Sequence, residues 1–151
     1  MKEKVKEVCV DACLILKLVL NETDSDLAEA LFAKWQEEGV KLIAPVFYPV
    51  EVDSVIRKKA SLASGADRIT PEQADAAFEA LQAIPVKTIH EPGQRKRAWE
   101  LARDLGLPVV YDSHYLALAE LRNCEFWTSD ERMYNSVRAK ISYIRLLKDE
   151  T

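Results

Sequence analysis

Four acidic residues that are far apart in the sequence each fall where a strand should end or a helix should begin. Asp11 directly follows Val5–Val10, a short segment rich in β-branched residues that predicts a buried strand. Glu51 falls in the first turn of the helix predicted after the second strand, and Asp130 follows the fourth. Asp112 begins another predicted helix. In a parallel sheet these places share one edge, so the four carboxylates are expected to converge.

Converging carboxylates need a cation. Two of them about 4 Å apart repel by roughly 4 kcal/mol at an effective dielectric constant of about 20, and a helix N-terminus offsets only about 0.3–1 kcal/mol of this. A site made only of carboxylate oxygens suits a hard divalent ion, Mg²⁺ or Mn²⁺, rather than zinc. Each acid taken singly is also compatible with an N-cap or an ordinary first-turn acid, so the prediction depends on all four together.

The segment around Asp112 shows why the ion is needed. In a helix, Asp112, Tyr115, Leu116 and Ala119 occupy one face, which is otherwise apolar and should point inward. A buried, unpaired carboxylate is costly and tends to take up a proton. One or two divalent ions above Asp112 would make its position tolerable.

Alternating strands and helices predict the elements that position these acids. The chain is expected to form an α/β fold with a mainly parallel sheet covered by helices on both faces, as one domain spanning residues 1–151. Strands are predicted at Val5–Val10, Lys41–Pro45, Pro85–Glu91, Cys124–Asp130 and Ile141–Leu147.

Helix signals separate the predicted strands. A helix over Ala12–Leu20 is followed by one capped by Thr23 or Asp24 and ending at Gly39. A third begins near Pro49. Three further helices follow: one starting with a capping box at Thr70, one ending at Gly106, and the Asp112 helix. Their inward stripes are Leu27, Ala30, Leu31, Lys34 and Trp35 in the second; Ala74, Ala77, Phe78 and Leu81 in the fourth; and Ala98, Leu101, Ala102 and Leu105 in the fifth.

Composition restricts the class of protein. Of 151 residues, 48% are hydrophobic and 30% charged, which is typical of a globular domain. The net charge of −4 excludes a globally basic nucleic-acid binder, so any RNA contact needs a local basic patch. Three cysteines without CxxC spacing favour free thiols in a reducing cytoplasm. No segment is long and apolar enough for a membrane span, and the N-terminal segment lacks the features of a signal peptide.

The segments that carry the four acids also resemble a known family. CVDACLILKLVLNE, APVFYPVEVDSVIRK, LGLPVVYDSHYLALAE and FWTSDERM follow in this order, each with its acid in place. In this arrangement the chain resembles a PIN domain, and most closely the VapC-type toxin ribonucleases, over nearly its whole length. The resemblance implies a three-layer α/β/α sandwich and metal-dependent cleavage of RNA.

By resemblance, Asp11, Glu51, Asp112 and Asp130 are the metal-binding and catalytic residues, with Asp11 and Asp112 holding the principal ion. Thr128 matches a supporting hydroxyl position. Ser54 stands where relatives commonly carry Asn, which weakens one supporting hydrogen bond. The implied reaction is attack of a metal-activated water on phosphorus, without a covalent enzyme intermediate. The implied partners are a cognate antitoxin and a second copy of the chain.

An acidic site repels RNA, so basic residues must flank it. Arg132, two residues after Asp130, is the first candidate, followed by Arg57 and Lys58 on the Glu51 helix and the run Arg95–Arg97.

The remaining polar and aromatic candidates are assigned to structure. His114 should turn away from Asp112, and His90 is also expected to be structural. Tyr48, Tyr111 and Tyr115 are read as packing residues rather than base-stacking ones, as are Trp35 and Trp99, both on helices.

Two other function classes remain open. One is a catalytically silent PIN-fold module that binds RNA or protein, which the presence of all four acids disfavours. The other is phosphotransfer of the haloacid dehalogenase type with Asp11 as nucleophile. Members of that class carry a DxD motif after the first strand, whereas this chain has Cys13 at the third position of the motif.

Overall fold

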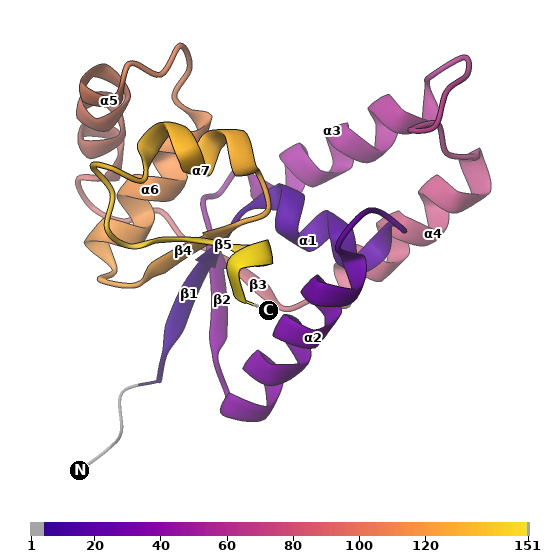
Figure 1. Ribbon diagram of the computed structural model, residues 1–151, viewed down its shortest axis with the longest axis horizontal. Helices are drawn as coiled ribbons and strands as arrows, with labels where there is room; N and C mark the ends of the chain where they lie inside the picture. The colour runs from indigo at the N-terminus through magenta and orange to yellow at the C-terminus, as the bar shows by residue number, and fades with distance from the viewer. Residues whose placement is uncertain (1–4, 151) are drawn as a thin grey trace.

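The computed structural model describes residues 5–150 and forms a five-stranded parallel sheet with helices on both faces (Figure 1). The predicted α/β fold with a parallel sheet is therefore confirmed. Residues 1–4 and 151, which the predicted domain and first segment include, lie outside the described residues. The strands are β1 (Glu7–Val10), β2 (Lys41–Ala44), β3 (Val86–Thr88), β4 (Glu125–Thr128) and β5 (Ile144–Leu146).

The strand order is β3-β2-β1-β4-β5, and every neighbouring pair is parallel. The helices are α1 (Ala12–Val19), α2 (Ser25–Glu38), α3 (Tyr48–Ala60), α4 (Pro71–Gln82), α5 (Gln94–Leu105), α6 (Tyr111–Leu121) and α7 (Glu131–Val137). A 3-10 helix, η1 (Leu147–Glu150), follows β5. Helices α1 to α4 lie on one side of the sheet, and α5 and α6 lie on the other (Figure 1).

The central strand β1 is buried along Val8, Cys9 and Val10 because it lies between β2 and β4 and beneath helices on both faces. Helix α6 contacts β1 and β4 and is covered on its outer side by α5. Tyr115 and Leu116 are therefore completely buried, which agrees with the inward face predicted for this helix.

Most helix boundaries follow the predicted signals. The Thr70 hydroxyl accepts from the Gln73 amide, and the Gln73 side chain accepts from the Thr70 amide, so the predicted capping box is confirmed. Gly39 and Gly106 end α2 and α5 with positive φ angles of 68° and 67°, a conformation that glycine adopts without strain.

The predicted start of α2 is wrong in detail. The Asp24 side chain caps nothing, and its backbone is left-handed. Instead, the buried Ser25 hydroxyl accepts from the Glu22 amide at 2.9 Å and donates to the Leu20 carbonyl at 3.0 Å. The inward stripe is also shifted, because Ala28 and Trp35 are buried whereas Ala30 and Lys34 are exposed.

Two aromatic residues predicted to pack inward, Trp99 and Phe78, do not do so. Trp35 is buried as predicted and packs edge-to-face on Trp127, whereas Trp99 is 68% exposed. Its neighbour Ala98 takes the inward position, and one residue along a helix turns the side chain by about 100°. Phe78 is 43% exposed at the edge of the α4 stripe.

The remaining differences concern element lengths. The third and fifth strands have three residues each and are shorter than predicted. Helix α7 was not predicted, since seven residues are too few to show an apolar period.

Candidate active site

The sheet order creates a crevice at the carboxyl ends of β1 and β4. After β1, the chain adds β2 and β3 on one side of β1, and it then adds β4 and β5 on the opposite side of β1. In open parallel sheets such a reversal of direction opens a space beyond the strand ends, where ligands bind. Asp11 directly follows β1, and Asp130 lies two residues beyond β4. The pairing of Val10 with Trp127 places the two strand ends side by side.

Two helix N-termini add the other acids. Glu51 is in the first turn of α3, and Asp112 is in the first turn of α6. The Tyr115 hydroxyl, one turn along α6 from Asp112, donates to a Glu51 carboxylate oxygen at 2.7 Å. This bond crosses from one helix to the other and orients the Glu51 carboxylate.

The four predicted acids line one cleft of about 380 Å³. The structure therefore brings Asp11, Glu51, Asp112 and Asp130 together from four separate segments. The other polar side chains of this acid cleft are Cys13, Lys17, Glu22, Lys59 and Ser129.

Thr128 connects two of the acids. Its completely buried hydroxyl donates to Asp11 Oδ2 at 2.8 Å and accepts from the Asp130 amide at 3.0 Å. The Asp130 side chain accepts from the Met133 amide and caps α7, so one residue serves the helix and lines the cleft. The position of Thr128 fits the supporting role expected of it.

The charged form of Asp11 is disfavoured in the absence of an ion. Burial, and then the charge on Asp112, raise the pKa of Asp11 from 3.8 to about 7, although the hydrogen bond from Thr128 lowers it. Burial also raises the pKa of Glu51, against the hydrogen bond from Tyr115. The pKa of Asp112 is raised by burial and by Asp130. Among residues 5–150, none of the four acids forms a salt bridge.

This donor set fits a hard divalent cation. The four acids offer only carboxylate oxygens, and a bound cation would offset the repulsion that, after burial, raises the pKa values of Asp11, Glu51 and Asp112. Within the described part of the chain, however, no three acid, His or Cys side chains are already arranged as a metal-ligand group. The chemistry of the donor atoms therefore fits a hard divalent ion.

Several other candidates lie outside the lining of the cleft. Ser54 and Lys58 are exposed on α3, and Arg57 lines a separate hollow with Pro71 and Phe78. Arg132 is exposed on α7. Their supporting and RNA-binding roles stay predictions.

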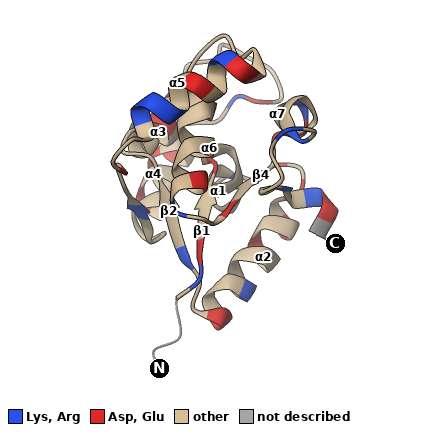
Figure 2. Ribbon diagram, turned by 90° about the vertical axis from the view of Figure 1, so that its left-hand side faces the viewer, with Lys and Arg blue, Asp and Glu red and all other residues tan. Residues whose placement is uncertain are grey.

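Helix α5 carries the basic run Arg95–Arg97 near its start and two acids, Glu100 and Asp104, further along (Figure 2). Arg97, the last residue of the run, forms a bidentate ion pair with Glu120 of α6. This arginine is therefore occupied in holding the two helices together.

The histidines take no part in the cleft. The His114 ring is within 3.2 Å of the Gln94 side-chain amide and packs edge-to-face on Phe47. Burial, followed by the charges of His90 and Arg95, lowers the pKa of His114. His90 is exposed. Neither side chain lines the acid cleft, which agrees with the structural role expected of both.

Sequence reasoning missed the five other polar residues of the cleft, Cys13, Lys17, Glu22, Lys59 and Ser129. Cys13 lies beside Thr128, with its sulfur 3.5 Å from the hydroxyl, and burial raises its pKa to about 12. Lys17, Glu22 and Lys59 line the mouth of the cleft. Lys59 follows Glu51 by eight residues, about two helical turns, but the meeting of Lys59 with Lys17 depends on how α1 and α3 pack.

Comparison with known proteins identifies the class. The family model described as PIN domain matches residues 8–138. The chain therefore belongs to the PIN domain family, whose members are generally nucleases that use divalent metal ions. A search of curated proteins found no significant match.

Two solved structures show the same fold. PAE2754 from Pyrobaculum aerophilum has a TM-score of 0.63 and 19% sequence identity, covering 96% of this chain and 92% of its own. VapBC2 from Rickettsia felis, bound to a DNA fragment from its promoter, has a TM-score of 0.63 and 12% identity, covering 93% and 96%. At these identities the likeness establishes the fold.

Proposed function

We propose that this protein is a metal-dependent endoribonuclease that hydrolyses RNA phosphodiester bonds, and that it is the toxin of a toxin–antitoxin pair. The observation that carries the proposal is the convergence of Asp11, Glu51, Asp112 and Asp130 on one cleft at the sheet edge. Membership of the PIN family supports nuclease activity. The choice of RNA and of an antitoxin partner depends on the resemblance to VapC-type toxins, and the VapBC2 structure supports it.

Asp11 and Asp112 would hold the principal Mg²⁺ or Mn²⁺, and Glu51 and Asp130 would complete the site. The bound ion would supply charge neutralisation at the phosphate and acidification of the attacking water. Thr128 fixes the orientation of Asp11, and Tyr115 fixes that of Glu51. Cys13 is held as a neutral thiol by its raised pKa, so it is unsuited to act as a nucleophile.

The direct test is Asp112→Asn, which keeps the shape of the side chain and removes its charge. We expect this variant to fold and to lose Mn²⁺-dependent cleavage of total cellular RNA. Asp104→Asn on α5 is the control, because Asp104 is exposed and pairs with Arg103 away from the cleft. Undiminished cleavage by a folded Asp112→Asn protein would reject the assignment.

One observation favours the second candidate, a silent PIN-fold module that binds without cutting. The acids are not preassembled into a metal-ligand group within residues 5–150. This candidate predicts that the wild-type protein binds RNA or a protein partner and cuts no RNA at any Mg²⁺ or Mn²⁺ concentration. The same cleavage assay therefore distinguishes the two candidates.

The proposal includes a homodimer in the cytoplasm, where RNA is available. Apolar side chains are exposed at the adjoining N-termini of α3 and α6, including Val46 at 56%, Val50 at 67% and Tyr111 at 55%. Phe47 packs edge-to-face on Tyr111 and joins the two groups into one surface. Such a surface is suited to a second copy. Sedimentation equilibrium should show a dimer that Val46→Asp weakens.

No helix within residues 5–150 is both long and apolar enough to cross a membrane.

A further inference from the structure

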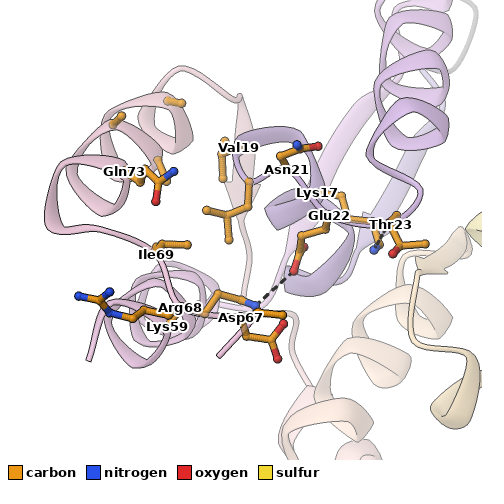
Figure 3. Close-up of a pocket in the computed structure, with 15 residues that line it drawn as sticks. Lys17, Val19, Asn21, Glu22, Thr23, Lys59, Asp67, Arg68, Ile69 and Gln73 are labelled. Atoms are coloured by element: carbon orange, nitrogen blue, oxygen red, sulfur yellow. Dashed lines mark hydrogen bonds and ion pairs between the residues drawn. The ribbon is translucent and has the colours of Figure 1, made fainter. Parts of the chain in front are cut away.

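A second hollow, of about 870 Å³, shares part of its lining with the acid cleft. Figure 3 shows the residues that line this groove. It lies between the chain that joins α1 to α2, the end of α3, the connection that follows it, and α4. Lys17, Glu22 and Lys59 line both this groove and the acid cleft. The two hollows therefore adjoin at these three side chains, which form the junction between them.

The side chain of each of the two lysines at the junction has one polar contact within residues 5–150. Lys59 Nζ lies 3.4 Å from a Glu22 carboxylate oxygen, and this ion pair spans from α3 to the α1–α2 connection (Figure 3). Lys17 Nζ donates to the Thr23 carbonyl at 2.5 Å. The Lys59–Glu22 ion pair is partly exposed, and such pairs contribute only about 0–1 kcal/mol, so an incoming anion can replace Glu22 beside Lys59.

The backbone that carries these charges is anchored. Ser25 fixes the α1–α2 connection through its bonds to the Glu22 amide and the Leu20 carbonyl. The Ile69 amide donates to the Lys59 carbonyl and ties the connection after α3 to the end of that helix. The junction lysines are thus presented from fixed segments.

Beyond the junction, the groove is suited to a nucleic-acid strand. Arg68 adds a third cation and Asp67 a second acid, and Asn21 and Gln73 add uncharged polar side chains (Figure 3). Val19 and Ile69 provide apolar surface between them. Cations that track a backbone, combined with surface on which bases can lie, are the usual elements of single-strand binding.

We propose that this groove carries single-stranded RNA on one side of the scissile bond, with Lys17 and Lys59 binding the phosphates nearest the acid cleft. The inference rests on the proposed function, since an RNA strand in the cleft must continue beyond it. The acid cleft repels the strand, and the two lysines at its mouth provide the opposite charge where the strand leaves. Glu22 then acts as a counterion that a phosphate displaces from Lys59.

If Glu22 has this role, substitution of Lys59 and substitution of Glu22 should change RNA affinity in opposite directions. If Lys59 binds phosphate, Lys59→Gln weakens RNA binding, whereas Glu22→Gln strengthens it by removing a competing charge. If the pair only stabilises the fold, both substitutions disturb the same contact and act in the same direction. Lys34→Gln is the control, because Lys34 is an exposed lysine on α2 that lines neither hollow and has no RNA-binding role assigned to it.

The experiment measures binding of a fluorescent single-stranded RNA oligonucleotide in EDTA by anisotropy, and its cleavage with Mn²⁺ by the same proteins. We expect Lys17→Gln with Lys59→Gln to weaken binding about tenfold and to reduce the slope of log affinity against log salt by about 0.7 for each lysine. Glu22→Gln should bind RNA more tightly than wild type, and Lys34→Gln should bind RNA as tightly as wild type.

Equal binding by wild type and the double lysine variant would overturn the inference and leave the groove for a protein ligand. A common direction of change for Lys59→Gln and Glu22→Gln would also overturn it. Cleavage separates this failure from that of the proposed function. A double variant that cuts with the wild-type KM rejects the groove alone, whereas a wild type that never cuts rejects the nuclease.

Discussion

The inner end of the acid cleft, around Asp11, and its outer end, where it adjoins the groove at Lys59 and Glu22, differ in how their charges are compensated. At the inner end, Asp11 is buried and is held by the neutral hydroxyl of Thr128. At the outer end, Lys59 and Glu22 are partly exposed and pair with each other. Among residues 5–150 no salt bridge compensates the charge of Asp11, and the pKa of Asp11 is raised to about 7. Substitutions should accordingly have larger effects at the inner end.

The largest expected effect is on catalysis, from Asp11→Asn. The substitution removes the most buried acid of the four and should lower the cleavage rate by about 10³-fold, since ion-assisted stabilisation of the transition state amounts to several kcal/mol. In EDTA the same variant should be more stable than wild type, because it no longer buries a disfavoured charge. RNA cleavage and urea unfolding measure the two effects. An Asp11→Asn protein that is less stable than wild type would contradict this description of the inner end.

The pH dependence of stability should reveal the same group. The pKa of Asp11 is raised from 3.8 to about 7, so between these values the folded protein binds more protons than the unfolded chain. Its contribution therefore makes the free energy of unfolding fall as pH rises from about 4 to about 7, by a total on the order of 4 kcal/mol. Urea unfolding in EDTA across this range measures the slope. Asp11→Asn should flatten it, and an equal slope in both proteins would exclude Asp11 as the source.

Thr128→Val should have the next largest effect. It leaves the Asp130 amide without its buried acceptor and removes the hydrogen bond to Asp11. The expected loss is about 2–3 kcal/mol of stability together with reduced cleavage. Thr128→Ser keeps the hydroxyl and should retain activity. If valine and serine behaved alike, the hydroxyl would not be what links the two acids.

Tyr115→Phe should have the smallest effect of these. The completely buried ring remains, and only the 2.7 Å hydrogen bond to Glu51 is lost. We expect about a tenfold fall in cleavage rate at saturating RNA, since hydrogen bonds to charged groups contribute about 1.5–3 kcal/mol. Glu51→Gln in the Tyr115→Phe background should add little beyond Glu51→Gln alone. Independent, additive losses would show that Tyr115 does not act through Glu51.

The sequence predicts the site better at its inner end than at its outer end. Asp11 and Asp130 could be placed because strand ends and helix starts are local signals, and parallel topology brings them to one edge. Lys17 and Lys59 could not be placed, because their meeting depends on how α1 and α3 pack. The same limit explains why Tyr115 was assigned to the correct face of α6 while its hydrogen bond to Glu51 was not predicted.

Errors in helix phase have a local cause. Trp99 was read as a packing residue because large aromatic side chains are usually buried, but the small residues Ala98 and Ala102 lie against α6 instead. In α2, the buried Ser25 and Ala28 replace the larger residues expected there. Close packing of helices favours small side chains, and a search for large apolar residues overlooks them.

Binding of Mn²⁺ followed by electron paramagnetic resonance tests the central claim most directly, because only the free aqueous ion gives the strong six-line signal. The wild-type protein should deplete this signal, and both Asp11→Asn and Asp112→Asn should leave it nearly unchanged while remaining folded. A wild type that leaves the signal intact at high protein concentration, or an Asp112→Asn protein that depletes it equally, would contradict a shared ion site in the acid cleft.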